Sequence, residues 1–319
     1  MPEAVITISN LTKQYNAARV KAVDGISFEV NRGELFAFLG VNGAGKSTTI
    51  NILCTLLGKT GGEVSVCGFD IERQPDEVKN NIGVVFQTGV LDDKLSVSDN
   101  LMFRGALFGL DKKTLAKRIN NLAVRLGMTE FLKRPYGKLS GGQKRKCDIA
   151  RALISNPKIL FLDEPTTGLD PQSRVDLWQV IRDIRDEFHT TIFLTTHYME
   201  EVNSADRIAI IDKGRLLCLD TPEGLKSNYS YDTVKLTVKN NNTEKIENIL
   251  KEHKLEYQFS VDTFTLKVKS GLERIEMLAG LKALLSSVEI IKGDMDSVFL
   301  NVVGGRTENG EISKSDKKK

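Results

Sequence analysis

Residues 40–47 read Gly40-Val41-Asn42-Gly43-Ala44-Gly45-Lys46-Ser47 and fit the pattern G-x-x-x-x-G-K-[ST]. Before this loop lies a nearly continuous apolar run, Glu34–Leu39, which predicts a buried strand. After it, Ile50, Leu53 and Leu57 recur at helical spacing and predict a helix. A glycine-rich loop between a strand and a helix is the setting in which this pattern binds phosphate. The stretch therefore predicts an α/β fold with a phosphate-binding loop.

The residue types of this loop suit a nucleoside triphosphate with Mg²⁺. Glycines let the backbone curl so that N–H groups point at phosphate oxygens, and the following helix dipole adds to that field. Lys46 supplies a charge for the β and γ phosphates, and Ser47 offers a hydroxyl to Mg²⁺. We expect the nucleotide to contact the following residues: Gly40, Asn42, Gly43, Ala44, Gly45, Lys46, Ser47 and Thr48.

A second anion-binding helix start is predicted at Leu139-Ser140-Gly141-Gly142-Gln143. Ser140 is well placed as the N-cap, and the two glycines expose backbone N–H groups. Cys147, Ala150 and Ile154 would share one face of the helix that follows, and Asn156-Pro157 would end it. The chain therefore carries two predicted anion-binding helix starts.

With both motifs present, residues 3–220 resemble an ABC-family nucleotide-binding domain. The resemblance implies a P-loop NTPase (RecA-like) core with an antiparallel β subdomain and a helical subdomain inserted at about residues 88–156. It also implies that Leu139–Gln143 of one protomer covers the γ-phosphate of ATP held by the other. The expected cofactors are ATP and Mg²⁺, and the expected partner is a second ATP-binding subunit in a homodimer.

Acidic residues follow another predicted strand, Ile159–Leu162. Because charges at the carboxyl end of a strand face the ligand crevice of an α/β sheet, Asp163 and Glu164 are candidates for the site. The resemblance implies that Asp163 holds Mg²⁺ and that Glu164 is the general base for the attacking water. It places Asp170 in a loop that crosses the dimer interface, with Ser140, Gly141, Gly142 and Gln143 on the same side.

Three single residues depend mainly on their place in the motif order. Gln87 follows the apolar run Gly83–Phe86 and resembles the glutamine that contacts Mg²⁺ or the water. His197 follows a predicted strand and resembles the histidine that touches the γ-phosphate and orients Glu164. Tyr15 resembles the aromatic residue that stacks on adenine. The alternatives are an ordinary surface residue for Gln87 and an ordinary surface or core tyrosine for Tyr15.

The C-terminal third changes pattern near Thr221-Pro222. We predict the order βαββαβ of a small α+β ferredoxin-like domain over residues 229–304, with its second helix at Leu272–Leu285. The predicted domains are thus 3–222 and 229–304, followed by a polar, disordered tail at 305–319. Asp296–Leu300 partly resembles the ending of ATPases from drug and antibiotic exporters, which favours export. A plain amphipathic helix closing the small domain is the alternative.

Composition narrows the choice of partner and compartment. A net charge of +3, from 45 basic and 42 acidic residues, gives no argument for nucleic acid as the main partner. The four cysteines form no C-x-x-C pair, which favours buried thiols in a reducing cytosol. No apolar run reaches the roughly 18 residues of a membrane helix, and Met1–Asn10 has no signal-peptide pattern. We expect a cytoplasmic protein bound to the cytoplasmic face of the membrane through an integral permease.

Three other functions are alternatives to ATP-driven transport. A soluble ABC ATPase acting on ribosomes or nucleic acid typically has two cassettes or a long coiled coil, whereas this chain shows one cassette and no sustained heptads. A regulatory module without catalysis would be expected to lack Lys46 or Glu164. A GTPase would carry N-K-x-D, which does not occur. The first of these three remains the main alternative, and Thr88–Asn100 is where the family would contact a permease.

Overall fold

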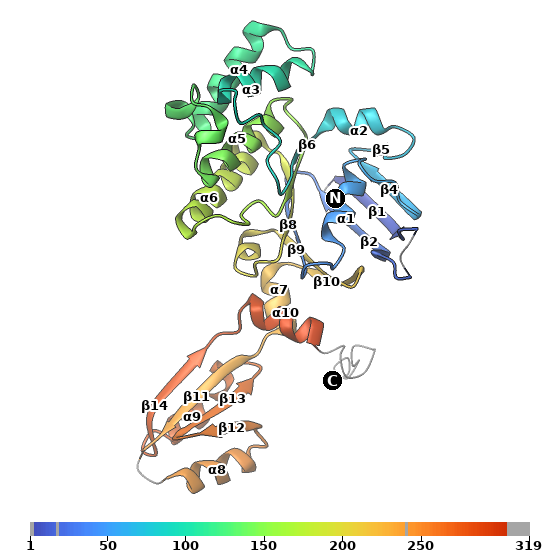
Figure 1. The fold of residues 1–319 in the computed structure, drawn as a ribbon. Helices are drawn as coiled ribbons and strands as arrows, with labels where there is room; N and C mark the ends of the chain where they lie inside the picture. Colours follow the sequence, from blue (N-terminus) through green and yellow to red (C-terminus); the bar gives the residue numbers. More distant parts are fainter. Residues whose placement is uncertain (1–2, 17–18, 240–241, 305–319) are drawn as a thin grey trace. The chain divides into compact units, whose positions relative to one another are not determined.

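The computed structural model describes residues 3–16, 19–239 and 242–304 (Figure 1). The chain divides into two compact units, residues 1–219 and 220–319. Helix α7 (Pro222–Tyr229) therefore belongs to the second unit, although the sequence placed the end of the first domain at residue 222. The tail predicted at 305–319 lies outside the described residues.

The first unit is built on a six-stranded sheet in the order β10-β9-β3-β8-β7-β6. Neighbouring strands from β6 to β9 run parallel. Every residue of the central strands β3, β7 and β8 is buried, as expected for parallel strands covered on both faces. The strands span β3 Leu35–Leu39, β6 Ile82–Val85, β7 Ile159–Asp163, β8 Thr191–Thr196, β9 Arg207–Asp212 and β10 Arg215–Asp220.

A second sheet, in the order β2-β1-β4-β5, is antiparallel and confirms the predicted β subdomain. Its side chains join the same core as the parallel sheet through stacked phenylalanines. The ring of Phe28 lies 5.3 Å from that of Phe36, which lies 5.4 Å from Phe193. The strands span β1 Ala4–Lys13, β2 Val23–Asn31, β4 Gly61–Val66 and β5 Phe69–Asp70.

The predicted helical subdomain lies between β6 and β7 in the chain (Figure 1). Its amphipathic helices bury one stripe each, because their apolar residues recur every three to four positions. It contains α3 Val97–Ala106, α4 Lys112–Arg125, the short 3₁₀ helices η1 Thr129–Phe131 and η2 Tyr136–Lys138, and α5 Gly141–Leu153. Within the described ranges, every helix is too short or too polar to span a lipid bilayer.

Other helices connect the strands of the first unit: α1 Lys46–Leu53, α2 Pro75–Asn81, α6 Pro171–Phe188 and the 3₁₀ helix η3 Glu201–Ser204. The prediction that Leu57 continues the helix after the phosphate loop is wrong. Helix α1 ends at Leu53, and Thr55 then adopts a left-handed conformation with φ of 60°. Cys67 and Cys218 are only half-buried, whereas both were expected to be buried.

The second unit has the predicted βαββαβ order, and its antiparallel sheet is arranged β12-β13-β11-β14. The first and third strands of the unit, β11 and β13, are central, and β12 and β14 lie at the edges, as in a ferredoxin-like unit. Its own core contains Leu236, Leu250 and Phe264, all buried. The elements are β11 Asp232–Val238, α8 Thr243–Glu252, β12 Tyr257–Ser260, β13 Thr263–Val268, η4 Leu272–Arg274, α9 Ile275–Gly280, β14 Leu285–Ile291 and α10 Met295–Gly304.

The helix predicted at Leu272–Leu285 is wrong in its second half. Helix α9 ends at Gly280, and Leu285 already pairs with Val238 as the first residue of β14. Strand pairing therefore overrides a helical spacing of leucines at this point. The last segment forms α10, which buries Met295, Val298, Phe299 and Val302.

Candidate active site

The phosphate loop lies between β3 and α1, at the carboxyl edge of the parallel sheet, where ligands of α/β folds bind. Gly45 has φ of 108°, and a Cβ there would lie 2.5 Å from the carbonyl oxygen of Ala22. Only glycine fits this turn, which leaves the start of α1 open to a phosphate. The loop borders a cavity of about 500 Å³ lined by Ala22, Asn42, Gly43, Gly45, Lys46, Ser47, Thr48, Gln87, Glu164, Thr167 and His197.

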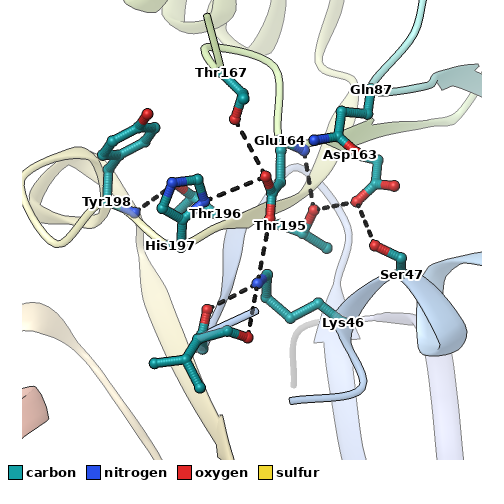
Figure 2. Close-up of polar contacts among 12 residues, drawn as sticks. Lys46, Ser47, Gln87, Asp163, Glu164, Thr167, Thr195, Thr196, His197 and Tyr198 are labelled. Carbon is teal, nitrogen blue, oxygen red and sulfur yellow. Dashed lines mark hydrogen bonds and ion pairs between the residues drawn. The ribbon is translucent and has the colours of Figure 1, made fainter. Parts of the chain in front are cut away.

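Lys46 is buried with only 4% of its surface exposed, so its ammonium group needs partners. Nζ donates to the carbonyl oxygens of Gly40 at 2.8 Å and Val41 at 3.2 Å. It also lies 3.2 Å from Oε1 of Glu164 (Figure 2). Lys46 thus forms an ion pair with Glu164, the carboxylate predicted to be the general base.

Asp163 is the last residue of β7 and connects Ser47 with the neighbouring strand. Its Oδ1 accepts a hydrogen bond from Thr195 Oγ1 at 2.6 Å and a long one from Ser47 Oγ at 3.4 Å. A carboxylate and a hydroxyl side by side are the hard oxygen donors that Mg²⁺ prefers. Gln87, whose side chain borders the same cavity, adds an amide oxygen, so the residues present fit a magnesium ion beside the triphosphate (Figure 2).

Glu164 follows directly after β7 with a left-handed backbone, φ of 45°. Thr167 Oγ1 donates to its Oε2 at 3.2 Å, and Nδ1 of His197 lies 3.2 Å from the same oxygen. Burial alone would raise the pKa of this carboxyl, but the Lys46 ammonium and the contact with His197 together more than offset it. The pKa of Glu164 therefore lies below its ordinary value, and the group is a carboxylate at neutral pH.

Hydrogen bonds connect the backbone around Gln87 to helix α5, whose N-cap is Ser140. Arg145, a buried residue of α5, donates to the carbonyl oxygens of Phe86 at 2.7 Å and Gln87 at 3.0 Å. Burial lowers the pKa of this guanidinium, with the Asp148 carboxylate acting in the opposite direction. The backbone around Gln87 and helix α5 are thereby held together.

The second motif forms a separate cluster with Asp170. Ser140 caps α5 and forms a capping box with Gln143. A Cβ on Gly142 would lie 2.8 Å from Oγ of Ser173, which itself donates to Asp170 at 2.6 Å. A Cβ on Gly141 would likewise come close to the side chain of Leu169, the residue before Asp170. None of the described residues in this cluster lines the cavity at Lys46.

Tyr15 lies at the edge of the site, beyond the residues that line the cavity. Its hydroxyl is 3.3 Å from Oγ1 of Thr48, and Nζ of Lys13 lies 5.4 Å from the centre of its ring. The side chain is 44% exposed, so one face is available to a ligand. This placement is compatible with stacking on a base and equally with a surface tyrosine.

Sequence reasoning missed Thr195 and Thr167. Thr195 is buried and bridges the site: it donates to Asp163 and accepts from the backbone N–H of Glu164 at 3.0 Å. Thr195 lies opposite Asp163 in the parallel register of β7 and β8, a pairing that the sequence alone does not give. Thr167 lies in the stretch after Glu164, but nothing in its spacing marks it as a partner of that carboxylate.

Comparisons with known proteins agree with this geometry. A family model described as "ABC transporter" matches residues 23–167. The chain is 35% identical over 316 residues to "Daunorubicin resistance ATP-binding protein DrrA2" of Streptomyces coeruleorubidus, a match that covers 96% of this chain and 97% of that protein. It is 33% identical over 312 residues to "Linearmycin resistance ATP-binding protein LnrL" of Bacillus subtilis, covering 94% and 98%.

Solved structures with the same fold include assembled cassettes. The cbiO1 protein of Clostridium perfringens, part of the ABC transporter complex cbiONQ, aligns with a TM-score of 0.65 and 25% identity over 87% of this chain and 99% of that one. A dimeric, post-hydrolysis structure of the ATP-binding cassette MJ0796, bound to ADP and phosphate, aligns with a TM-score of 0.62 and 26% identity. That alignment covers 68% of this chain and 98% of the other.

Proposed function

Given that this chain belongs to the ABC transporter family, as a subunit that binds and hydrolyses ATP, we propose that Glu164 is its catalytic base. The observation that carries the proposal is the position of this carboxylate between Lys46 and His197, on the wall of the nucleotide-sized cavity. A charged carboxylate there can accept a proton from water as the water attacks the γ-phosphorus.

The remaining residues around the cavity take supporting roles. Lys46 leaves Glu164 and pairs with the β and γ phosphates, which frees the carboxylate for the water. His197 orients Glu164 and donates toward the γ-phosphate. When bound at Ser47, Asp163 and Gln87, Mg²⁺ would neutralise charge on the β and γ oxygens. The bond from the γ-phosphorus to the bridging oxygen breaks, and ADP and phosphate are released.

We further propose that each active site is composed of two copies of this chain. The cluster of Ser140, Gly142 and Asp170 can contribute helix-terminal N–H groups to phosphate, but it does not border the cavity of its own chain. A second copy in the opposite orientation would bring that cluster to the γ-phosphate. ATP then holds the two copies together, and hydrolysis weakens the contact because one phosphate is lost.

A surface on the helical subdomain is suited to a membrane permease. Phe103 is 62% exposed and Leu107 is 68% exposed, at the end of α3, and Phe108 follows them. Exposed apolar side chains that cluster mark a protein contact more often than an ordinary surface. We propose that an integral membrane permease covers them and holds the chain at the cytoplasmic face of the membrane.

Export is the direction we propose for transport. DrrA2 and LnrL are named for resistance to daunorubicin and linearmycin, and both match this chain across its two units. The helix α10, whose Asp296–Leu300 segment suggested an exporter, is present with Val298 and Phe299 buried. The proposed cargo class is a drug-like compound moved out of the cell.

The Glu164→Gln variant tests the chemical role. The amide matches the carboxylate in size and shape, but it is neutral and cannot accept the proton. We expect the rate of phosphate release to fall about 10²- to 10⁴-fold while MgATP still binds. The exposed Glu130→Gln variant serves as the control and should match the unmodified chain. Turnover within about threefold of normal in Glu164→Gln would remove this residue from the role of base.

Affinity purification from detergent-solubilised native membranes tests the transport role. We expect the chain to retain a multi-span membrane protein, and we expect Phe103→Glu to lose it without a change in the ATPase rate of the purified chain. Val124→Glu changes an exposed apolar residue on a different helix, α4, and this variant should retain the membrane protein. Recovery of ribosomes or nucleic acid in place of a membrane protein would favour the soluble ATPase instead.

A further inference from the structure

Arg174 joins two loops of one chain. The first, here called the Asp170 loop, lies before α6 and contains Leu169 and Asp170; the second lies after β8 and contains His197 and Tyr198. Arg174 lies one turn into α6, whose N-cap is Asp170. Its Nε donates to the carbonyl oxygen of Leu169 at 3.2 Å, and its Nη2 donates to the hydroxyl of Tyr198 at 3.4 Å. The guanidinium carbon also lies 4.3 Å from the centre of the Tyr198 ring. One planar, rigid group therefore contacts both loops at once.

Tyr198 carries this contact to His197. The two rings are 4.1 Å apart between centres, with their planes at 37°. The backbone of Tyr198 is fixed separately, because its N–H donates to Thr196 Oγ1 at 3.0 Å and that hydroxyl donates to the buried Glu201 at 2.7 Å. The side chain of Tyr198, however, is held by Arg174. The position of the Tyr198 ring thus depends on the arginine while the loop backbone stays anchored.

The series of contacts ends at the carboxylate proposed as the base. Nδ1 of His197 lies 3.2 Å from Oε2 of Glu164 (Figure 2). From the carbonyl of Leu169 to Glu164 the path is Leu169, Arg174, Tyr198, His197 and Glu164, and every step is a direct contact. Along it, the Arg174 cation lies on the aromatic face of Tyr198, and an imidazole nitrogen of His197 lies beside the Glu164 carboxylate.

We propose that Arg174 and Tyr198 are positioning residues that make the orientation of His197 and Glu164 depend on the Asp170 loop of the same chain. This inference rests on the proposed function, in which Asp170 contacts the second copy. When a second copy contacts the Asp170 loop, the carbonyl of Leu169 is fixed, and Arg174 is fixed with it. The Tyr198 ring then holds His197 against Glu164. Without that contact the base is poorly oriented, so ATP bound to a single chain is hydrolysed slowly.

Paired substitutions at the two ends of this contact test the proposal. We expect Tyr198→Leu and Arg174→Gln each to lower kcat about three- to thirty-fold, the range for loss of a partly buried cation–π contact. KM for ATP should stay within about twofold, because neither residue borders the nucleotide cavity. Tyr198→Phe keeps the ring and should retain activity. The double variant should be no slower than the slower single variant, since both changes break one path.

Two controls separate this proposal from loss of fold and from failure of the two-chain site. Arg182→Gln, on the same helix with Gln179 as a neighbouring partner, should leave kcat unchanged. Thermal melting shows whether each variant is folded, and Arg174→Gln serves if Tyr198→Leu does not fold. In a Glu164→Gln background, Tyr198→Leu should still form an ATP-held dimer, because the path acts on the chemical step.

Three results would overturn the proposal: normal kcat in both single variants, equal losses in Tyr198→Phe and Tyr198→Leu, or losses that multiply in the double variant. A Glu164→Gln parent that forms no dimer with MgATP would instead refute the two-chain site itself.

Discussion

Glu164 holds an unusual backbone conformation at the point where charge is needed. A left-handed φ of 45° in a glutamate costs free energy, and such residues persist where surrounding contacts fix them. Here the backbone N–H donates to Thr195 Oγ1, and the carboxylate contacts Lys46 and His197. These contacts hold the carboxylate at the wall of the cavity.

The ion pair of Glu164 gives a pH-dependent stability. A carboxyl whose folded pKa is lowered adds stability above its unfolded value of 4.5 and loses it as the pH falls through the folded pKa. Without nucleotide, we expect the difference in Tm between the unmodified chain and Glu164→Gln to be constant at neutral pH and to narrow below about pH 4.5. Glu130→Gln should show no such narrowing. A difference that stays level down to about pH 3.5 would show that the pair adds no stability.

At the scale of elements, helix α5 performs two tasks. Its N-terminus presents Ser140 and Gly142, while two of its arginines, Arg145 and Arg151, donate hydrogen bonds to strand β6 and the residues after it. Arg145 donates to Phe86 and Gln87, and Arg151 donates to the carbonyl oxygen of Val84. In the proposed two-chain site, a shift of Gln87 on binding MgATP would therefore move the helix whose N-terminus contacts the ATP of the second copy.

Removal of the Arg145 contacts tests this connection. Arg145→Met leaves two backbone carbonyls near Gln87 without their charged donor, and we expect the free energy of unfolding to fall by about 2 kcal/mol. Urea titration measures the loss, and amide hydrogen exchange should become faster at residues 84–90. Lys146→Met on the same helix should change stability by less than about 0.5 kcal/mol. Unchanged exchange at 84–90 in Arg145→Met would show that α5 does not hold this segment.

Much of the fold could be predicted from the sequence because local signals and tertiary pairing agree there. The apolar runs of β3, β7 and β8 match buried parallel strands, and the residues that follow them meet at one edge of the sheet. Local signals failed at Leu285, where pairing with Val238 decides the structure. Contacts such as Thr195 with Asp163, or Arg145 with Phe86, could not be foreseen from spacing, since they join residues 32 and 59 positions apart.

For the whole molecule, the decisive feature is that the two helix starts predicted to bind phosphate do not share a cavity within one chain. Lys46 and Glu164 border one cavity, while Ser140 and Asp170 form their cluster elsewhere on the same unit. A single chain can hold ATP through the first set alone. In the site proposed above, two copies of the chain would close both sets on one γ-phosphate, and the cassette MJ0796, bound to ADP and phosphate, is itself a dimer.

The molar mass of Glu164→Gln in solution, with and without MgATP, tests this most directly. We expect single chains without nucleotide, and with MgATP a dimer that carries two ATP molecules. Adding Ser140→Arg should abolish the dimer and leave ATP bound to single chains, because only the covering cluster is blocked. A Glu164→Gln chain that binds ATP and keeps the mass of one chain, or a dimer that persists with Ser140→Arg, would contradict the two-chain site.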